Sequence, residues 1–570
     1  MDVAATLGAA GPCISSRRGS RARLLIRLVA GALALFSAAV GLLFVLGPSV
    51  APRAGPAPSG VPAPASGTGG GPAATGGLSG ALARVAADSP RRRVEVIIQL
   101  RRGVDAAQGR ALVRSLGGQP GADLHIINGL SARLAAPAAR RLAQSTLVRA
   151  VSLNAAIRNT TLNNATPSTL ATSFDQSTGA SRLWYRSTGE GIGVAVIDTG
   201  IDGDLPDFQT SQGSSTSRVS ASAVIDPKAT TAGDTYGHGT AVAGLVAGNG
   251  WARDSADSLF GEYAGTAPDA NLISVKVADD SGAATTLDAI YGLQFVVDHR
   301  IDYNIRVANL SFRSTSAESH TTDPLDAAVE QAWLHGIAVV AAAGNLGTAS
   351  GAVSYAPGND PYVITVGATD NQGTVTNWDD VEASWSSRGV TQDGFAKPDV
   401  LAPGAHIVST LAPGSSFAAA CPTCVIGGAY FQLSGTSLAA PIVSGIVADL
   451  LAAHPGWTPA MVKGAIVNTA VRLAGGGGEV RATGAFWAGG DQLVSDRGLT
   501  PSDLIDPDTS TIDYNAASWS AASWSTATDP LAASWSAASW SCLSCSSAGG
   551  NDVSPTSASW SDVGWATTWG

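Results

Sequence analysis

Between residues 174 and 473 the chain alternates short apolar runs with longer helical patterns, and this alternation restricts its fold more than any other feature. The runs are rich in β-branched residues and do not alternate with polar ones, which is typical of strands buried on both faces of a parallel sheet. The block, taken as residues 174–475, is therefore predicted to be an α/β domain. We expect strands at 193–197, 272–277, 307–310, 338–343 and 363–366, and helices at 287–299 and 324–335.

A smaller module precedes this block. Residues 91–160 predict a compact α+β domain. Residues 51–90 are dominated by Ala, Pro, Gly and Ser and are expected to form a linker that buries little apolar surface. Within the module we expect strands at 94–100, 125–134 and 147–157, and helices at 105–116 and 137–145.

The first 50 residues are predicted to direct export. An Arg-rich run precedes an uncharged apolar stretch at 28–46, which is the layout of a signal peptide. As a helix the stretch would be about 28 Å long, close to the roughly 30 Å of a bilayer core, so an uncleaved membrane anchor at 28–46 fits equally well. By the positive-inside tendency the rest of the chain crosses the membrane, which predicts a secreted or cell-surface protein.

Charge and composition limit the partners of this chain. The formal net charge is -10, and the basic residues gather in the first 150 positions, so we expect no nucleic-acid partner for the main body. In the segment 476–570, half of the chain's 14 Trp residues follow position 515, most of them in AASWS and SASWS repeats. We interpret this segment as a low-complexity tail, with contact to the cell surface as its functional alternative.

Three polar residues that could form a catalytic triad stand at predicted ends of strands and helices, each within two residues of a Gly. Asp198 ends the strand at 193–197, His238 opens a helical stretch, and Ser437 opens another. A hydroxyl nucleophile needs a base, and the base needs a carboxylate that fixes its tautomer. Asn345 ends a further strand and could donate to an oxyanion. Each residue alone could equally be a turn or cap residue; the combination and its order favour catalysis.

The segments around these residues resemble the four signature segments of the subtilase family, the subtilisin-like serine peptidases. They read VAVIDTGID (194–202), GHGTAVAG (237–244), AAAGN (341–345) and LSGTSLAAPIVSG (433–445). The resemblance implies a seven-stranded parallel sheet flanked by helices, a triad of Asp198, His238 and Ser437, and an oxyanion hole completed by Asn345. INGLSARL (127–134) resembles part of a subtilase propeptide.

This resemblance also implies a function. It predicts a secreted or cell-surface serine endopeptidase that works through an acyl-enzyme and matures by autoproteolytic removal of its propeptide, between about residues 157 and 174. The implied partners are protein or peptide substrates and the propeptide as an intramolecular inhibitor. The chemistry requires no cofactor.

The substrate-binding strand departs from the family pattern. Where the family usually has Ser-Leu-Gly-Gly, this chain has Ser311, Phe312, Arg313 and Ser314. If this strand pairs with a substrate backbone, Arg313 narrows or charges a subsite, and we expect a preference against bulky or basic residues there. The other predicted substrate-binding residues are Ala342, Ala343 and Gly344.

Metal and cysteine sites have a weaker basis in the sequence. Asp202, Asp204 and Asp207 follow the triad Asp; structural calcium there rests on family analogy only, and a solvated turn is the favoured interpretation. Four of the five Cys residues form two CxxC pairs. A disulfide within each pair is favoured over half of a zinc site. The disulfide candidates are Cys421, Cys424, Cys542 and Cys545.

Two other functions were weighed. An inactive subtilase-like protein whose tail binds a cell surface is disfavoured, because all four catalytic positions are present. A nucleotide-binding α/β protein is disfavoured because no G-x-G-x-x-G follows the first strand and there is no P-loop.

Overall fold

The computed structural model describes residues 77–88, 92–159, 161–162, 173–253, 255–257, 260–505 and 540–541. They belong to one compact unit. The predicted export segment, most of the Trp repeats, Cys542 and Cys545 lie outside the described residues.

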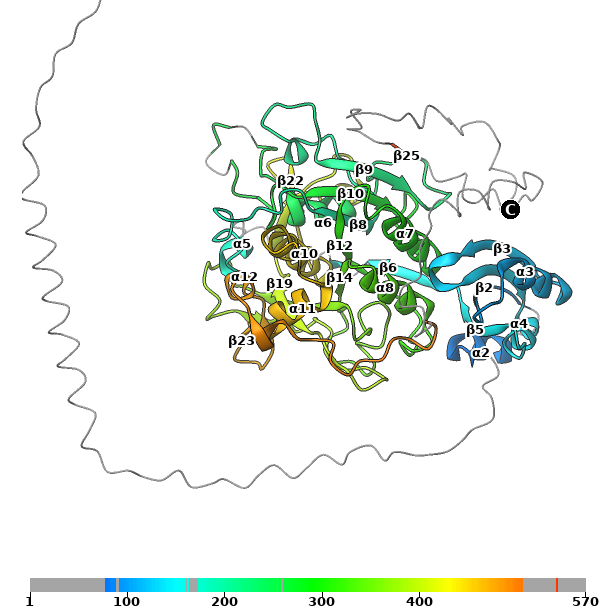
Figure 1. Cartoon of the computed structure of the whole chain (residues 1–570). Helices are drawn as coiled ribbons and strands as arrows, with labels where there is room; N and C mark the ends of the chain where they lie inside the picture. Colours follow the sequence, from blue (N-terminus) through cyan, green and yellow to red (C-terminus); the bar gives the residue numbers. More distant parts are fainter. Residues whose placement is uncertain are drawn as a thin grey trace, which may run out of the picture. The chain divides into compact units, whose positions relative to one another are not determined.

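A parallel sheet forms the centre of the larger block (Figure 1). Seven strands run parallel in the order β19-β15-β14-β12-β8-β10-β9, which confirms the predicted subtilisin-like sheet. Their side chains are buried on both faces, as the continuous apolar runs indicate. Their bounds are Val219–Val224 (β9), Asn271–Lys276 (β10), Gly193–Asp198 (β8), Ile305–Leu310 (β12), Ala338–Ala342 (β14), Ile364–Asp370 (β15) and Val400–Pro403 (β19).

Shorter strands border this sheet. Gly478–Glu479 (β24) adds a parallel pairing to β19, and Val471–Arg472 (β23) pairs with β24. Val381–Glu382 (β16) pairs with β15, and Trp540–Ser541 (β25) pairs with β9. A separate antiparallel group joins Ile407–Thr410 (β20), Val425–Ile426 (β21) and Tyr430–Gly435 (β22), and Gly389–Val390 (β17) pairs with Ala396–Lys397 (β18).

The helices divide into buried and partly exposed ones. His238–Ala247 (α6) and Thr436–Ala453 (α10) are apolar all round and almost wholly buried, and α10 lies beside β12 and β14 (Figure 1). Thr286–Asp298 (α7) begins with a capping box of Thr285 and Asp288, and Pro324–Leu334 (α8) begins at the N-cap Asp323. The other helices are Phe174–Ser177 (α5), Ser416–Ala420 (α9), Pro459–Asn468 (α11) and Ala482–Phe486 (α12).

Among the described helices, only α10 is long and apolar enough to span a membrane by length and composition. Since 89% of its apolar window is buried inside the protein, we assign it as the core helix of the α/β block.

The N-terminal module forms its own five-stranded sheet in the order β1-β5-β2-β4-β3. Its strands are Gly77–Leu78 (β1), Arg93–Leu100 (β2), Gln119–Leu124 (β3), Gly129–Ala135 (β4) and Val148–Leu153 (β5). Its helices are Gly80–Asp88 (α2), Ala106–Ser115 (α3) and Ala136–Ala143 (α4).

The two faces of this small sheet pack on different partners. Val96 and Ile98 belong to the module's own apolar core. Ile97, between them, belongs to the core of the large block, as do Leu124 and Ile126. Side chains alternate between the faces of a strand, so one face covers the module's helices and the other covers the α/β block.

Two predicted boundaries are wrong. The predicted linker 51–90 includes α2 and β1, whose residue Leu82 is fully buried in the module. The predicted tail starts too early at 476, because residues 476–505 pack on the α/β block through buried residues such as Val480 and Leu504. Composition misses both segments because small residues can pack as well as form linkers.

Candidate active site

Asp198 and His238 form a buried pair at the carboxyl end of β8. Asp198 is the last residue of β8, and His238 is the first residue of α6. His238 Nδ1 lies 2.6 Å from Asp198 Oδ1, and the Thr199 N–H donates to the same oxygen at 2.8 Å. An imidazole held this way keeps its second nitrogen, Nε2, as the group that can accept a proton.

A second buried carboxylate positions the start of α6. Asp234 accepts hydrogen bonds from the backbone N–H groups of Gly237 and Thr240, each at 2.7 Å, and from Thr199 Oγ1 at 2.8 Å. Burial raises the pKa of Asp234 above its usual range. The sequence did not predict a role for Asp234. An Asp a few positions before the Gly-His start of a helix is typical of a residue that caps the helix, and this pattern could have indicated it.

The backbone at this helix start has no room for larger residues. A Cβ on Gly239 would lie 2.2 Å from the carbonyl oxygen of Gly200. Gly237 has φ +103°, a left-handed conformation that favours glycine. The two glycines that flank His238 therefore set how closely it approaches Asp198.

Ser437 and Asn345 meet at the start of α10. Asn345 Oδ1 accepts hydrogen bonds from the backbone N–H and the hydroxyl of Thr436, each at 3.0 Å. The hydroxyl of Thr436 in turn accepts from the Gly344 N–H at 3.0 Å. These contacts orient the Asn345 amide beside the residue that follows Thr436, which is Ser437.

Helices α6 and α10, which begin with His238 and near Ser437, pack against each other. Both helices begin at the carboxyl edge of the parallel sheet, since one is tied to Asp198 and the other to Asn345 just after β14. A Cβ on Gly445 would lie 2.9 Å from the Val246 carbonyl oxygen. Gly445 and Val246 each stand eight positions after Ser437 and His238, respectively. The contact between α6 and α10 therefore lies the same number of residues from His238 as from Ser437.

The Ser437–His238 hydrogen bond is not formed in this state. His238 Nε2 is buried and has no hydrogen-bond partner among the described residues. Catalytic hydrogen bonds often tighten only when a substrate is held for reaction.

A chain of hydrogen bonds between hydroxyl and amide groups ends at the backbone carbonyl of Ser437. Ser444 Oγ donates to Asn309 Oδ1 at 2.9 Å, and Asn309 Nδ2 donates to Ser311 Oγ at 2.8 Å. Ser311 Oγ then donates to the carbonyl oxygen of Ser437 at 2.8 Å. The predicted substrate-binding residue Ser311 thus contacts the nucleophile helix through its side chain, a role that the sequence did not indicate.

The segment that follows the N-terminal module pairs with strands on both sides of this helix start. Ala156–Asn159 (β6) lies antiparallel between Ala284–Thr285 (β11) and Phe312–Ser314 (β13). Thr161–Leu162 (β7) pairs with Ser434 and Gly435 of β22, directly before Ser437. The predicted substrate-binding strand, β13, is therefore paired with strand β6 of the same chain.

Arg313 folds back from that strand. Its guanidinium carbon lies 4.5 Å from the centre of the Tyr355 ring, and its Nη1 donates to the Ser314 carbonyl at 3.0 Å. A Cβ on Gly344 would lie 3.2 Å from Arg313 Cδ. Burial lowers the pKa of Arg313. Of the other predicted substrate-binding residues, Ala342 ends β14, and the Ala343 N–H donates to the Val366 carbonyl at 2.9 Å.

The acidic residues after Asp198 differ in exposure: Asp204 is exposed in a turn, Asp202 is partly buried and Asp207 is buried. Asp207 is fully buried and accepts from Thr410 Oγ1 at 2.7 Å, the Ala252 N–H at 2.8 Å and the Tyr430 hydroxyl at 3.0 Å. Asp202 Oδ1 accepts from the Asp234 N–H at 2.9 Å. The solvated-turn expectation is wrong for Asp207, because the residues near 252 and the strand β22 cover it.

Cys421 and Cys424 are joined by a disulfide, with their Cα atoms 5.3 Å apart. Cys424 is buried, and the bridge closes the short turn between α9 and β21.

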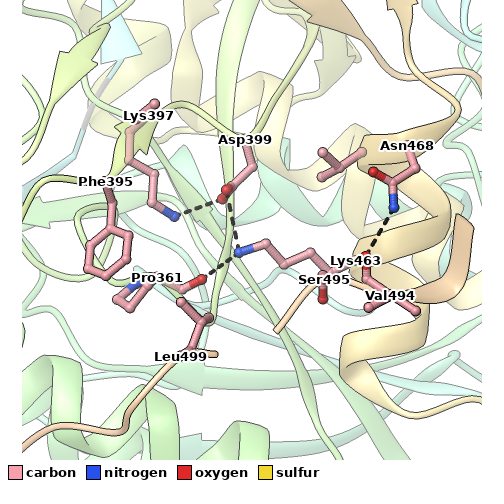
Figure 2. A pocket seen from close by; sticks show the side chains of 11 residues that line it. Pro361, Phe395, Lys397, Asp399, Lys463, Asn468, Val494, Ser495 and Leu499 are labelled. Atoms are coloured by element: carbon pink, nitrogen blue, oxygen red, sulfur yellow. Dashed lines mark hydrogen bonds and ion pairs between the residues drawn. The ribbon is translucent and has the colours of Figure 1, made fainter. Parts of the chain in front are cut away.

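A pocket of about 240 Å³ lies on other elements than the triad (Figure 2). Lys397 and Lys463 both point toward Asp399, with Nζ–Oδ distances of 2.7 and 3.4 Å. Lys463 Nζ also donates to the carbonyls of Pro361 and Val363 at 2.6 and 3.0 Å. Both ammonium groups are thus fully used in holding the backbone before β15 and β19.

The parallel sheet, the buried Asp–His pair and the serine at the start of a central helix define a protein of the subtilisin-like α/β class. The chain matches the model of the subtilase family (Peptidase_S8) over residues 189–497. The chain belongs to the subtilase family.

Curated relatives and a solved structure agree with this assignment. Over 286 residues the chain is 40% identical to serine protease AprX of Bacillus subtilis (strain 168), covering 49% of this chain and 61% of that protein. It is 33% identical to subtilisin E of the same strain over 288 residues, covering 50% and 62%. The chain thus spans about three fifths of the length of these relatives.

Fervidolysin from Fervidobacterium pennivorans, a keratinolytic enzyme related to subtilisin, is similar in structure, with a TM-score of 0.52 and 25% identity. The match covers 70% of this chain and 62% of that one.

Proposed function

We propose that this protein is an exported serine endopeptidase that hydrolyses peptide bonds of proteins or peptides through an acyl-enzyme. The observation that carries the proposal is the buried 2.6 Å contact between His238 Nδ1 and Asp198 Oδ1, in a chain whose helix α10 packs on α6 and carries Ser437 in its first turn.

In this mechanism Ser437 Oγ attacks the carbonyl carbon of the scissile bond. His238 Nε2 takes the hydroxyl proton and then gives it to the leaving amine. Asp198 keeps Nδ1 protonated and stabilises the imidazolium. Water then attacks the acyl-enzyme, again with His238 as the base, and releases the new carboxylate.

The oxyanion is stabilised at the start of α10. The Ser437 N–H and the Asn345 Nδ2 group donate to the developing negative charge, since Asn345 Oδ1 is already used by Thr436. The positive end of the helix dipole acts in the same direction. The chemistry needs no metal in this scheme.

Casein hydrolysis by matched variants tests the proposal. Wild type and Ser437→Ala are to be purified side by side, and circular dichroism serves as the check that both are folded. We expect Ser437→Ala to be folded and nearly inert. A Ser437→Ala protein that hydrolyses casein at the parental rate contradicts the assignment.

We also propose that residues 77–160 are a propeptide that occupies its own enzyme's substrate site. Antiparallel β6 lies on the β13 strand as a substrate would, and Ile157 is buried there. β7 leaves on the other side, paired with Ser434 and Gly435. The chain therefore crosses the Ser437 helix start between Asn159 and Thr161.

The register of these pairings supports one bond as the site of cleavage during maturation. Pairing on one side ends at Asn159 and on the other begins at Thr161, so we expect self-cleavage between Thr160 and Thr161. N-terminal sequencing of the secreted protein should give Thr161 as the first residue, or a trimmed end shortly after it. A mature start before residue 90 contradicts the propeptide assignment.

Arg313 is proposed to restrict a subsite. It replaces a small residue of the family pattern, stacks on Tyr355 and approaches Gly344, so bulky or basic substrate residues should be disfavoured there. Profiling of a peptide library with wild type and Arg313→Gly tests this. The variant should accept larger and basic side chains; identical profiles dismiss the hypothesis.

A further inference from the structure

A group of buried acidic residues lies at the start of α8 and in the loop before β15, away from the elements that carry the triad. Asp326, Glu330 and Asp360 are each 0% exposed. Asp326 and Glu330 are four positions apart on α8 and so share one face of that helix. Ligand atoms of His320, Glu330 and Asp360 all lie within 4.8 Å of one another.

Several oxygens in this group have no partner. Both carboxylate oxygens of Asp326 and Oδ2 of Asp360 are buried without a hydrogen bond among the described residues, as is the amide oxygen of Asn359. The rest of the group is bonded: Asp360 Oδ1 accepts from the Tyr362 N–H at 2.8 Å. Buried polar atoms are rarely left unpaired, so these oxygens indicate a missing ligand.

The nearby cations cannot neutralise the group. Lys397 Nζ is bound to Asp399 Oδ2 at 2.7 Å and Thr365 Oγ1 at 2.8 Å. His320 Nδ1 lies 3.3 Å from Glu330 Oε1 and can carry at most one charge. A buried cluster of this charge requires a cation or several bound protons.

The chemistry of the free atoms selects the cation. All of them are oxygens of carboxylates or an amide, which calcium prefers. His320, which contacts Glu330, would orient that ligand rather than bind the ion.

We propose that Asp326, Glu330, Asp360 and Asn359 form a binding site for one calcium ion. The ion would join the first turns of α8 to the loop before β15. It would also fix residues 499–505, because Glu330 Oε2 accepts from the Ser502 N–H at 2.7 Å and Ser502 Oγ donates to the Thr321 carbonyl at 3.0 Å. The site does not depend on the proposed peptidase activity.

Calcium binding by the full chain tests the proposal. The Ser437→Ala background prevents self-digestion and keeps the readout independent of activity. After removal of metal with EGTA, bound calcium is measured by equilibrium dialysis and the unfolding temperature by calorimetry, with and without added calcium. We expect calcium to raise the unfolding temperature by a few degrees.

Variants locate the site. Asp326→Asn and Asp360→Asn should each bind one calcium fewer than the parent and lose the corresponding shift in unfolding temperature. Asp326→Asn should also be more stable than the parent without metal, because a repelling charge is gone. Asp449→Asn is the matched control: Asp449 is a fully buried carboxylate whose oxygens also lack partners, but it lies on α10. It should keep the calcium shift.

Three results would overturn the proposal. The first is unchanged calcium binding in both cluster variants. The second is a parent chain without any calcium response, which would leave protons as the only occupants. The third is zinc or manganese bound at these residues in preference to calcium. If Asp326→Asn does not fold, Asn359→Ala replaces it and should weaken calcium binding at least tenfold.

Discussion

The hydrogen bonds around His238 show how much of the candidate site depends on residues without a catalytic motif of their own. Asp234 holds the backbone on both sides of the histidine, and Thr199 joins Asp234 to the strand that carries Asp198. The sequence predicted the triad and Asn345, because their motifs are distinctive. It did not predict Asp234 or Asn309, because a buried hydrogen bond between distant residues leaves no local pattern.

Removal of the Asn345 side chain should impair catalysis more than binding. Asn345→Ala loses a donor that acts on the oxyanion, so kcat should fall by roughly 10²–10³, a magnitude measured in a subtilisin, while KM changes little. Steady-state kinetics on a chromogenic peptide measure this. A kcat within threefold of the parent would exclude Asn345 from the oxyanion hole.

A second residue-level prediction concerns the pH dependence of stability. Glu479 is fully buried, and burial together with the neighbouring Asp380 carboxyl raises its pKa to about 9. The folded chain therefore keeps a proton that the unfolded chain releases near pH 4.5. The stability contribution of Glu479 is complete below that pH and is lost as the pH rises through about 9.

Glu479→Gln removes this titration. In the Ser437→Ala background its unfolding temperature should match the parent near pH 4.5 and exceed it by several degrees at pH 9. The exposed Glu190→Gln should follow the parent at every pH. Unfolding curves of Glu479→Gln that run parallel to the parent from pH 4.5 to 9 contradict the expected burial cost.

At the scale of secondary-structure elements, the contact between α6 and α10 sets the geometry of the site. Glycine at position 445 allows the Val246 carbonyl and Thr266 to approach α10, and a Cβ there would lie 2.0 Å from Thr266 Oγ1. This close packing fixes the position of α6 relative to α10.

Gly445→Ala should therefore force the helices apart. We expect a loss of about 1–3 kcal/mol in the free energy of unfolding and a lower kcat, because Ser437 moves relative to His238. Gly456→Ala, where a Cβ meets nothing within 4 Å, is the control and should stay within about 0.5 kcal/mol of the parent. Denaturant unfolding of both variants in the Ser437→Ala background measures the stabilities, and steady-state kinetics of Gly445→Ala with Ser437 intact measures kcat; equal stabilities would show that the packing is loose.

The sequence predicted elements unevenly. Strands β8, β10, β12, β14 and β15 were found because continuous apolar runs mark buried parallel strands. Strand β9, with the sequence VSASAV, alternates small polar residues with apolar ones and was missed. Strand β3 was missed because its sequence QPGADL contains Pro and Gly, which usually indicate turns.

At the scale of the whole molecule, the N-terminal module and the α/β block meet through particular contacts. The Ile126 N–H donates to Gln294 of α7 at 3.3 Å, and the Leu287 N–H at the start of the same helix donates to Asn154 Oδ1 at 2.9 Å. The sequence indicated the two units but not this docking, because contacts between distant segments carry no periodic signal.

Asn154→Ala should weaken the binding of the N-terminal module to the α/β block. The variant leaves a helix N–H without its acceptor, a loss of about 1 kcal/mol or roughly fivefold in affinity. Active peptidase should therefore appear sooner after secretion than in the parent. Ser115→Ala, an exposed residue whose hydroxyl donates to the Leu112 carbonyl within its own helix α3, should not change the time course. A delayed or unchanged onset for Asn154→Ala argues against this contact as part of inhibition.

Labelling of the mature protein with a fluorophosphonate, followed by peptide mapping, tests the triad most directly. The reagent phosphonylates a serine only where a neighbouring base activates the hydroxyl. We predict one label per molecule, on Ser437, and none in His238→Ala. A folded mature protein that takes up no label, or takes it up at another serine, would contradict the convergence of Asp198, His238 and Ser437.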